Sequence, residues 1–223
     1  MPELPEVETV RRGLEQLVVG RHVDEVLVAR ADAEPPLHTH VQLRFDDGTA
    51  LWFVDPRTFG EMVVFDPGNV EVEIPDLARL GPDPIADGLT LGQLRAIVRP
   101  RHRQLKQLLL DQHVIAGIGN IYGDEILHAA RLRPDRPSDS LSRRSEARLH
   151  RSMHEVLDAA IGAGGSTLRD AQYVDLFGNG GSYQDEHAVY GRAGERCLTC
   201  GRGVIRRIVV AKRSTHYCPV CQR

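Results

Sequence analysis

The chain has 223 residues, of which 41% are hydrophobic and 26% are charged, and this length suits one large domain or two modest ones with proper cores. No apolar run approaches the roughly 20 residues of a membrane-spanning helix. The N-terminus carries Glu3, Glu6 and Glu8 and has no basic region followed by an apolar stretch, so we expect a soluble cytoplasmic protein without a secretory signal.

The formal net charge of −3 is distributed unevenly along the chain. Residues 1–94 carry a net charge of −11 and residues 152–191 carry −5, whereas residues 95–151 carry +6 and residues 192–223 carry +7. Two basic blocks therefore stand on an acidic background. Because the local field at a contact surface governs association, such blocks are compatible with a polyanionic partner. By charge alone, two solvated basic faces explain them equally well.

The predicted elements begin with a helix. Pro5 is followed by Val7, Val10, Leu14 and Leu17 at spacings of three and four, which indicates a helix that begins through a proline-compatible first turn. Residues 23–30 predict a strand. Residues 40–54 predict two strands joined by a turn at residues 46–48.

The second part of the chain has a different pattern. Two prolines and two glycines in residues 80–90 indicate a linker, and helical periodicity follows from Leu91. We therefore expect a β-rich N-terminal domain over residues 1–79, a linker over residues 80–90, a helical domain over residues 91–191 and a short basic tail over residues 192–223.

The first residues allow two interpretations. Removal of Met1 would leave Pro2 with a free secondary amine, and α-amino groups have pKa values of roughly 7.7–8.0, so this amine is a potential nucleophile. Alternatively, the prolines only begin the helix, and the nearby carboxylates complement its positive end.

The tail contains every cysteine of the chain, in two CxxC pairs: Cys197, Cys200, Cys218 and Cys221. This spacing predicts one structural zinc ion held by four thiolates, with no open coordination position. Two disulfides would need an oxidising compartment, for which the sequence gives no targeting signal. Between the pairs we expect a basic hairpin that turns at residues 212–214 and can meet phosphates.

A glycine-rich turn precedes another predicted helix. Gly117 and Gly119 lead into Asn120, and the exposed N–H groups at a helix start form an anion site. A DNA phosphate fits this turn better than a nucleotide does, because no strand precedes it. A plain helix–helix turn explains the glycines equally well.

The assembled motifs closely resemble the formamidopyrimidine-DNA glycosylase and endonuclease VIII family, and lean toward its formamidopyrimidine branch. The resemblance covers residues 2–14, 55–60, 80–84, 108–127, 164–170, 189–197 and 212–221. It implies an α+β multi-domain fold with an N-terminal helix, a β-sandwich-like domain, a helix–two-turn–helix domain and a four-cysteine zinc hairpin. It also implies a monomeric bacterial enzyme, associated with the nucleoid, that binds damaged double-stranded DNA.

The activity implied by the resemblance is excision of oxidised purines (8-oxoguanine and formamidopyrimidines) followed by cleavage of the abasic strand. Pro2 would form a Schiff base with C1′ of the sugar, and β- and δ-elimination would follow. Glu3 would act as general acid and base beside it.

Further roles follow from matched positions. Asn120 and Arg213 resemble the pair that grips the phosphates flanking the flipped nucleotide, and Arg213 is grouped with the catalytic residues. Arg57 and Phe59 resemble the residues that fill the gap in the duplex. His38 and Arg101 resemble further backbone contacts. Residues 173–186 occupy the place of the loop that closes over an everted base.

The sequence departs from the family between residues 30 and 38. Family members have several more strands there, with a phosphate-binding lysine and a void-filling methionine, and both are absent here. No lysine precedes Lys106. Three interpretations stay open: a working enzyme of narrowed range, a DNA-binding paralogue that scarcely cleaves, or a chain shortened from a longer parent.

Overall fold

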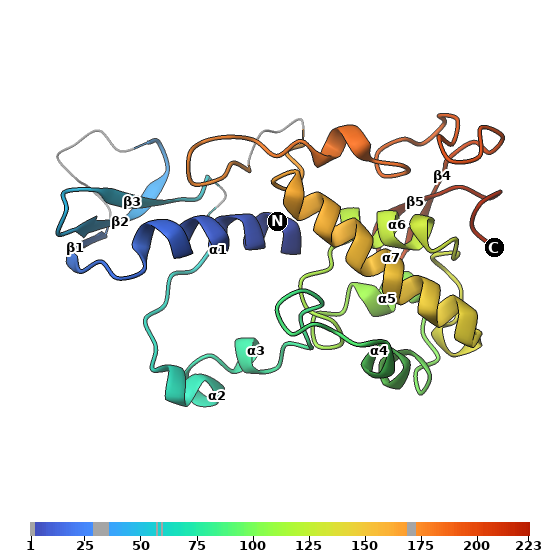
Figure 1. Cartoon of the computed structure of the whole chain (residues 1–223), viewed down its shortest axis with the longest axis horizontal. Helices are drawn as coiled ribbons and strands as arrows, with labels where there is room; N and C mark the ends of the chain where they lie inside the picture. Colours follow the sequence, from blue (N-terminus) through green and yellow to red (C-terminus); the bar gives the residue numbers. More distant parts are fainter. Residues whose placement is uncertain (1–2, 29–35, 57, 59, 169–172) are drawn as a thin grey trace. The chain divides into compact units, whose positions relative to one another are not determined.

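The computed structural model describes residues 3–28, 36–56, 58, 60–168 and 173–223. The chain divides into two compact units. Unit 1 comprises residues 1–13 and 75–223, and unit 2 comprises residues 14–74. Figure 1 shows the elements coloured along the chain.

The elements of the first half are α1 (Leu4–Val18), β1 (Val23–Val28), β2 (Thr39–Phe45), β3 (Ala50–Val54), the 3₁₀ turn η1 (Pro67–Asn69), α2 (Val70–Glu73) and α3 (Pro75–Ala78). Those of the second half are α4 (Leu91–Val98), α5 (Leu105–Leu109), α6 (Asn120–Ala129), η2 (Ser138–Ser140), α7 (Arg143–Gly162), η3 (Tyr183–Glu186), β4 (Arg206–Val210) and β5 (Arg213–Tyr217).

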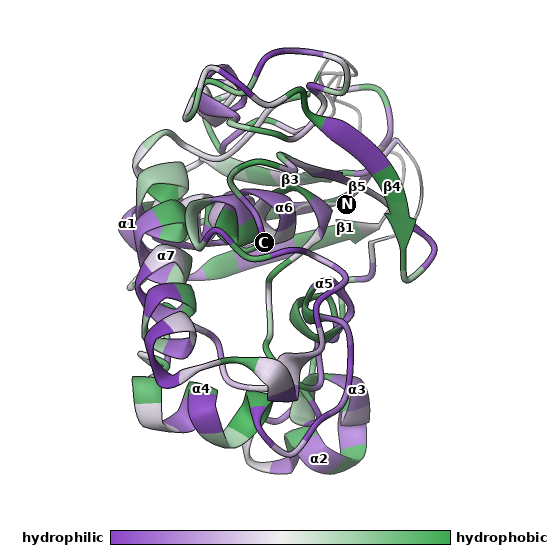
Figure 2. Ribbon diagram, turned by 90° about the vertical axis from the view of Figure 1, so that its right-hand side faces the viewer, coloured by the Kyte–Doolittle hydropathy of each residue, from purple (hydrophilic) through white to green (hydrophobic). Residues whose placement is uncertain are grey.

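Unit 1 is built around α6, which packs against α5, α7 and strand β5. Eight successive residues of α6, from Ile121 to His128, are buried. The helices begin where the sequence supplies caps. Thr90 and Gln93 form a reciprocal capping box at the start of α4, and the Ser142 hydroxyl accepts from the Ser145 N–H at the start of α7. In Figure 2, hydrophilic and hydrophobic residues follow one another along α7, as expected for a helix with one buried face.

Unit 2 is organised on one antiparallel sheet in the order β1-β2-β3. Val26, Leu43 and Leu51 are partners across the three strands and therefore share one face of the sheet. Among the described residues of this unit only Gln42 and Phe45 are buried. Trp52 and Val54 on β3 are 42% and 41% exposed. The described part of unit 2 thus has little core of its own.

The predicted helices and strands agree with these elements. The helix from Leu91 and the strands around the turn at residues 46–48 are confirmed, as is the fold class with its N-terminal helix, helical segment and cysteine-bearing hairpin. Among the described residues, no helix is long and apolar enough to cross a membrane. The predicted domain boundary at residue 80 stays a prediction.

The predicted turn of the hairpin is wrong by about one residue. The structure turns at Ala211 and Lys212, which both have positive φ angles of 50° and 62°, and Arg213 and Ser214 already belong to β5. A two-residue turn of this kind favours asparagine and glycine. Because the sequence has neither residue here, its local signal could not locate the turn.

Candidate active site and zinc site

The carboxylate of Glu3 is held at the N-terminus of α6. Its Oε1 accepts a hydrogen bond from the Ile121 N–H (2.9 Å), and its Oε2 accepts one from the Tyr122 N–H (3.1 Å). Desolvation by burial nevertheless raises the pKa of Glu3 to about 7, against the lowering effect of these two bonds. Near neutral pH the carboxyl group therefore exists in both protonation states, as a group that gives and takes protons requires.

Two glycines allow this close approach. A Cβ atom at Gly119 would lie 2.3 Å from Cδ of Glu3, and one at Gly117 would lie 2.7 Å from Cβ of Leu4. Gly117 also has a φ of +79° and accepts a hydrogen bond from the Leu4 N–H (2.7 Å). The glycine turn therefore receives the start of the chain. The anion at this helix N-terminus is the protein's own Glu3, so the expectation that these N–H groups receive a DNA phosphate is wrong.

Glu6 lies at the centre of a buried polar network. One carboxylate oxygen accepts from the Glu3 N–H (2.8 Å), and the other accepts from the Tyr122 hydroxyl (2.5 Å) and the Ser166 N–H (2.7 Å). The Ser166 hydroxyl lies 3.0 Å from the Tyr122 hydroxyl and 3.2 Å from Nε2 of His187. Because Glu6 binds the peptide N–H of Glu3, this network fixes the main chain next to Pro2.

A buried ion pair supports the same helix end. Nζ of Lys106 donates to the Asn120 carbonyl (2.6 Å) and to Oδ1 of Asp124 (2.7 Å), and desolvation lowers the pKa of Lys106 while Asp124 opposes this effect. The other oxygen of Asp124 accepts from the His216 N–H (2.8 Å). Asp124 therefore joins α5, α6 and the zinc hairpin, and removal of one partner would leave a buried charge.

Asn120 connects α6 to the hairpin. Its Nδ2 donates to the carbonyl of Ser214 (3.1 Å), which is the neighbour of Arg213 in β5. The structure thus brings Glu3, Asn120 and the strand that carries Arg213 together in unit 1. In Figure 2 strand β4, the partner of β5, is hydrophilic at its start, where the sequence has Arg206 and Arg207.

Two further predicted contact residues, Arg101 and His38, belong to different units. Arg101 follows α4 and donates to the Ile97 carbonyl (2.8 Å). His38 is exposed, with a φ of 69°, and belongs to unit 2. Pro2, Arg57 and Phe59 lie outside the described residues. The roles of all these residues stay predictions.

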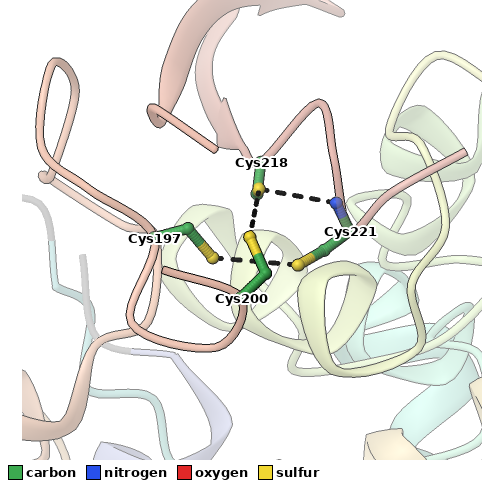
Figure 3. A group of neighbouring side chains, drawn as sticks. All are labelled: Cys197, Cys200, Cys218 and Cys221. Atoms are coloured by element: carbon green, nitrogen blue, oxygen red, sulfur yellow. Dashed lines mark hydrogen bonds between the residues drawn. The ribbon is translucent and has the colours of Figure 1, made fainter. Parts of the chain in front are cut away.

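The four cysteines form a cluster whose sulfur atoms face one another (Figure 3). All four Sγ atoms lie within 4.8 Å of one another, and the pairs Cys197–Cys221 and Cys200–Cys218 are each 3.8 Å apart. The sulfur–sulfur edge of a tetrahedron with Zn–S bonds of about 2.3 Å is also about 3.8 Å. The cluster therefore fits one structural zinc ion.

Sequence reasoning missed the buried polar residues that organise the site. Glu125 is the clearest case, because its carboxylate accepts from the N–H groups of Ala188 (2.9 Å), Val189 (3.0 Å) and Tyr190 (2.8 Å). His128 similarly connects α6 to Thr199 and Gln222 beside the cysteines. The available signal was the occurrence of Asn120, Asp124 and His128 at spacings of four, with Glu125 beside Asp124, on a helix whose other residues are mostly apolar.

This frame, with an acid–base carboxyl group at a helix N-terminus beside a basic zinc hairpin, is that of a DNA glycosylase with a helix–two-turn–helix domain. The family description "Formamidopyrimidine-DNA glycosylase N-terminal domain" matches residues 1–33 and 27–62, and "Formamidopyrimidine-DNA glycosylase H2TH domain" matches residues 80–172. "Zinc finger found in FPG and IleRS" matches residues 194–223.

Curated relatives and solved structures agree with these matches. A formamidopyrimidine-DNA glycosylase of Thermus thermophilus is 41% identical over 266 aligned residues, which cover 100% of this chain and 98% of the relative. That of Enterococcus faecalis is 35% identical over 277, covering 100% and 98%. The chain therefore belongs to the formamidopyrimidine-DNA glycosylase family.

The solved structures match over the same extent. The crystal structure of the MutM (Fpg) protein from Thermus thermophilus superposes with a TM-score of 0.88 at 39% identity, covering 99% of this chain and 98% of that one. Lactococcus lactis Fpg, in a complex with DNA that contains an abasic site, gives a TM-score of 0.85 at 31% identity, covering 99% of both chains.

The comparison also confirms that the N-terminal domain is shortened. The alignment with the Thermus protein spans 266 positions, whereas this chain has 223 residues, a difference of 43 positions. The N-terminal family description matches in two pieces that meet at residues 27–33. In this chain β1 pairs directly with β2.

Proposed function

We propose that this chain excises oxidised purines, including 8-oxoguanine and formamidopyrimidines, from double-stranded DNA and then cuts the abasic strand. The observation that carries this proposal is the carboxyl group of Glu3, which is fixed by two N–H groups of α6 and has its pKa raised to about 7. Family membership supports the same reaction. We further propose that the enzyme acts as a monomer in the cytoplasm of a bacterial cell.

In the proposed reaction, the amine of Pro2, once Met1 has been removed, attacks C1′ of the damaged nucleotide. A bond forms between the Pro2 nitrogen and C1′, the glycosidic bond breaks, and the base leaves with the bonding electron pair. Glu3 protonates the ring oxygen O4′, so that the sugar opens to an iminium ion. Loss of a C2′ proton then expels the 3′ phosphate, and a second elimination expels the 5′ phosphate.

The electrostatics of the chain support the DNA partner. The +6 block of residues 95–151 and the +7 block of residues 192–223 both belong to unit 1. Asn120 and Arg213, in the role of phosphate contacts, lie at the junction of these blocks, because Asn120 binds the neighbour of Arg213. The zinc ion, when bound to the four cysteines, holds the knuckles that support this hairpin.

The experiment that tests the proposal is borohydride trapping on duplex DNA with either an 8-oxoguanine or an abasic site. We expect a covalent product at the N-terminal residue. The chain has only two lysines, Lys106 and Lys212, so peptide mapping distinguishes three amines. Lys212→Arg serves as the matched control and should still be trapped, whereas a protein blocked at its N-terminus should bind DNA without forming a product. A product on either lysine would refute the role of Pro2.

The shortened N-terminal domain favours a second candidate, a DNA-binding paralogue with little excision activity. The same assay separates the two, because the paralogue would bind the lesion duplex but give no trapped product on either substrate. Given the missing lysine, we expect slow excision of the base and faster cleavage of a ready-made abasic site.

DNA binding itself has a separate test. We expect affinity to fall steeply with salt, and Arg213→Ala to weaken binding and to reduce the slope of log K against log salt by about one. Equal affinity at low and physiological salt would show that the basic blocks do not contact DNA.

A further inference from the structure

A cavity of about 680 Å³ lies beside the zinc knuckles, where the end of α6 and the start of α7 approach Cys200 and Cys221. Five arginines line it: Arg131, Arg136, Arg148, Arg202 and Arg223. No aspartate or glutamate is among its lining residues. Such a density of guanidinium groups around one hollow is costly unless an anion balances it, because like charges repel.

The described part of the chain offers these arginines no acidic side chain as a partner. None of the five forms an ion pair with an aspartate or glutamate among the described residues. Arg136 instead donates to the hydroxyl and the carbonyl of Ser140 (both 3.0 Å), and Arg148 donates to the Ala130 carbonyl. These acceptors are neutral, so they orient the guanidinium groups and leave their charge unbalanced. Desolvation, and after it the neighbouring Arg131, lowers the pKa of Arg148.

The zinc site accounts for only part of this charge. Four thiolates around one Zn²⁺ carry a formal charge of about −2, and two of these thiolates, Cys200 and Cys221, line the cavity. Five guanidinium groups therefore keep an excess of about three positive charges. The main-chain oxygen of Arg223, which accepts a hydrogen bond from Arg136 (3.4 Å), is a further neutral acceptor.

Arg131 also occupies a backbone position that is strained for a residue with a side chain. It has a φ of 54° and follows α6, where the Leu132 N–H donates to the Leu127 carbonyl (3.0 Å) and the Arg131 N–H to the His128 carbonyl (2.9 Å). This is the helix-terminating motif in which glycine is usual, because a side chain is strained there. An arginine at this position supplies a guanidinium group to the cavity, although its positive φ strains the backbone.

The cavity is separate from the predicted DNA contact at Asn120. Asn120 begins α6 and Arg131 follows its other end, so eleven residues of helical rise, about 16 Å, separate them. Guanidinium groups pair with phosphate oxygens through two parallel hydrogen bonds, and a cavity of this size has room for more than one phosphate.

We propose that this arginine cavity binds a polyanion through two or more phosphate groups, at a site distinct from the one that grips the damaged nucleotide. The phosphates come either from consecutive nucleotides of a nucleic-acid strand that extends past the hairpin or from a free polyphosphate. Phosphate is favoured over an acidic peptide because the protein works on DNA, which brings phosphates to the hairpin at high local concentration.

The test is calorimetric titration of the zinc-loaded protein with inorganic tripolyphosphate and, separately, with an undamaged single-stranded oligonucleotide. Arg131→Gly removes a lining charge and relieves the strained backbone, so this variant should keep or raise the melting temperature while it weakens tripolyphosphate binding at least about fivefold. Arg202→Gln should also weaken it. Arg143→Gln is the matched control, because Arg143 is exposed at the start of α7 and does not line the cavity.

Loss of oligonucleotide binding in Arg131→Gly identifies strand phosphates as the source, and loss of tripolyphosphate binding alone identifies a free polyphosphate. Both results support the proposal. It is overturned if tripolyphosphate does not bind, if Arg143→Gln weakens binding as much as the cavity variants do, or if only Arg213→Ala weakens it. Tighter binding of a glutamate-rich peptide than of tripolyphosphate at the same arginines would also overturn it.

Discussion

The carboxyl group of Glu3 shows how one residue can make stability depend on pH. Its pKa is raised from 4.5 to about 7 on folding, chiefly by desolvation, so the folded state binds more protons than the unfolded state between these two values. The free energy of unfolding should therefore fall as pH rises from 4.5 through 7. Glu3→Gln should remove at most about 3 kcal/mol of this decline. Urea unfolding of both proteins at pH 5 and pH 8 measures it, and parallel declines would contradict the raised pKa.

A second prediction at the scale of one residue concerns Gly119. Because a Cβ atom there would lie 2.3 Å from Cδ of Glu3, Gly119→Ala should displace the carboxyl group, lower stability by about 1–3 kcal/mol and slow base excision. Gly162→Ala is the matched control, since nothing lies within 4 Å of its added Cβ and alanine favours a helix. Thermal unfolding and single-turnover excision rates test the pair. An unchanged excision rate in Gly119→Ala would show that the position of the Glu3 carboxyl group does not matter for base excision.

At the scale of the element, some features of helix α6 could be predicted from the sequence and others could not. Its helical pattern and the place of Asn120 could be predicted from local spacing. The distant partners, His216 for Asp124 and residues 188–190 for Glu125, could not, because they lie about 60 to 90 positions away and no local pattern encodes such pairs. The anion site before α6 was predicted correctly as geometry but given the wrong occupant, since only the folded chain brings Glu3 to it.

The zinc hairpin yields a prediction of its own. It is short, and its small buried cluster contains Val189 and Ile205 beside the cysteines, so we expect it to fold only with bound metal. Metal analysis should find one zinc per chain, and Cys200→Ser or a strong chelator should abolish DNA binding. Circular dichroism should show that α6 and α7 persist, because their core lies elsewhere. A metal-free protein that still binds DNA would contradict this prediction.

For the whole molecule, the two units differ sharply in how much they bury. The largest core cluster lies entirely in unit 1, whereas unit 2 buries only Gln42 and Phe45 among its described residues. Its strands also expose Val23, Val26 and Trp52, and the N-terminal domain is shorter than that of its relatives. The sequence revealed the deletion through the missing family segment. Because the missing segment is part of the sheet, the deletion also predicts a weakened fold of the N-terminal domain. Which apolar side chains stay exposed depends on how the remaining strands pair, which no local pattern encodes.

This difference predicts the order in which the parts of the molecule open. Local unfolding requires little free energy where few apolar contacts are lost, so amides of β2 and β3 should exchange hydrogen at least about tenfold faster than those of α6. Mass spectrometry of the zinc-loaded full chain can compare peptides from residues 39–54 and 120–129. The strands of the hairpin, β4 and β5, provide an internal control, because they form a sheet of similar strand length that rests on α6. Equal protection of β2 and α6 would show that the sheet of unit 2 is as stable as the core of unit 1. The apolar faces of the shortened domain would then have to be covered by contacts other than a core within unit 2.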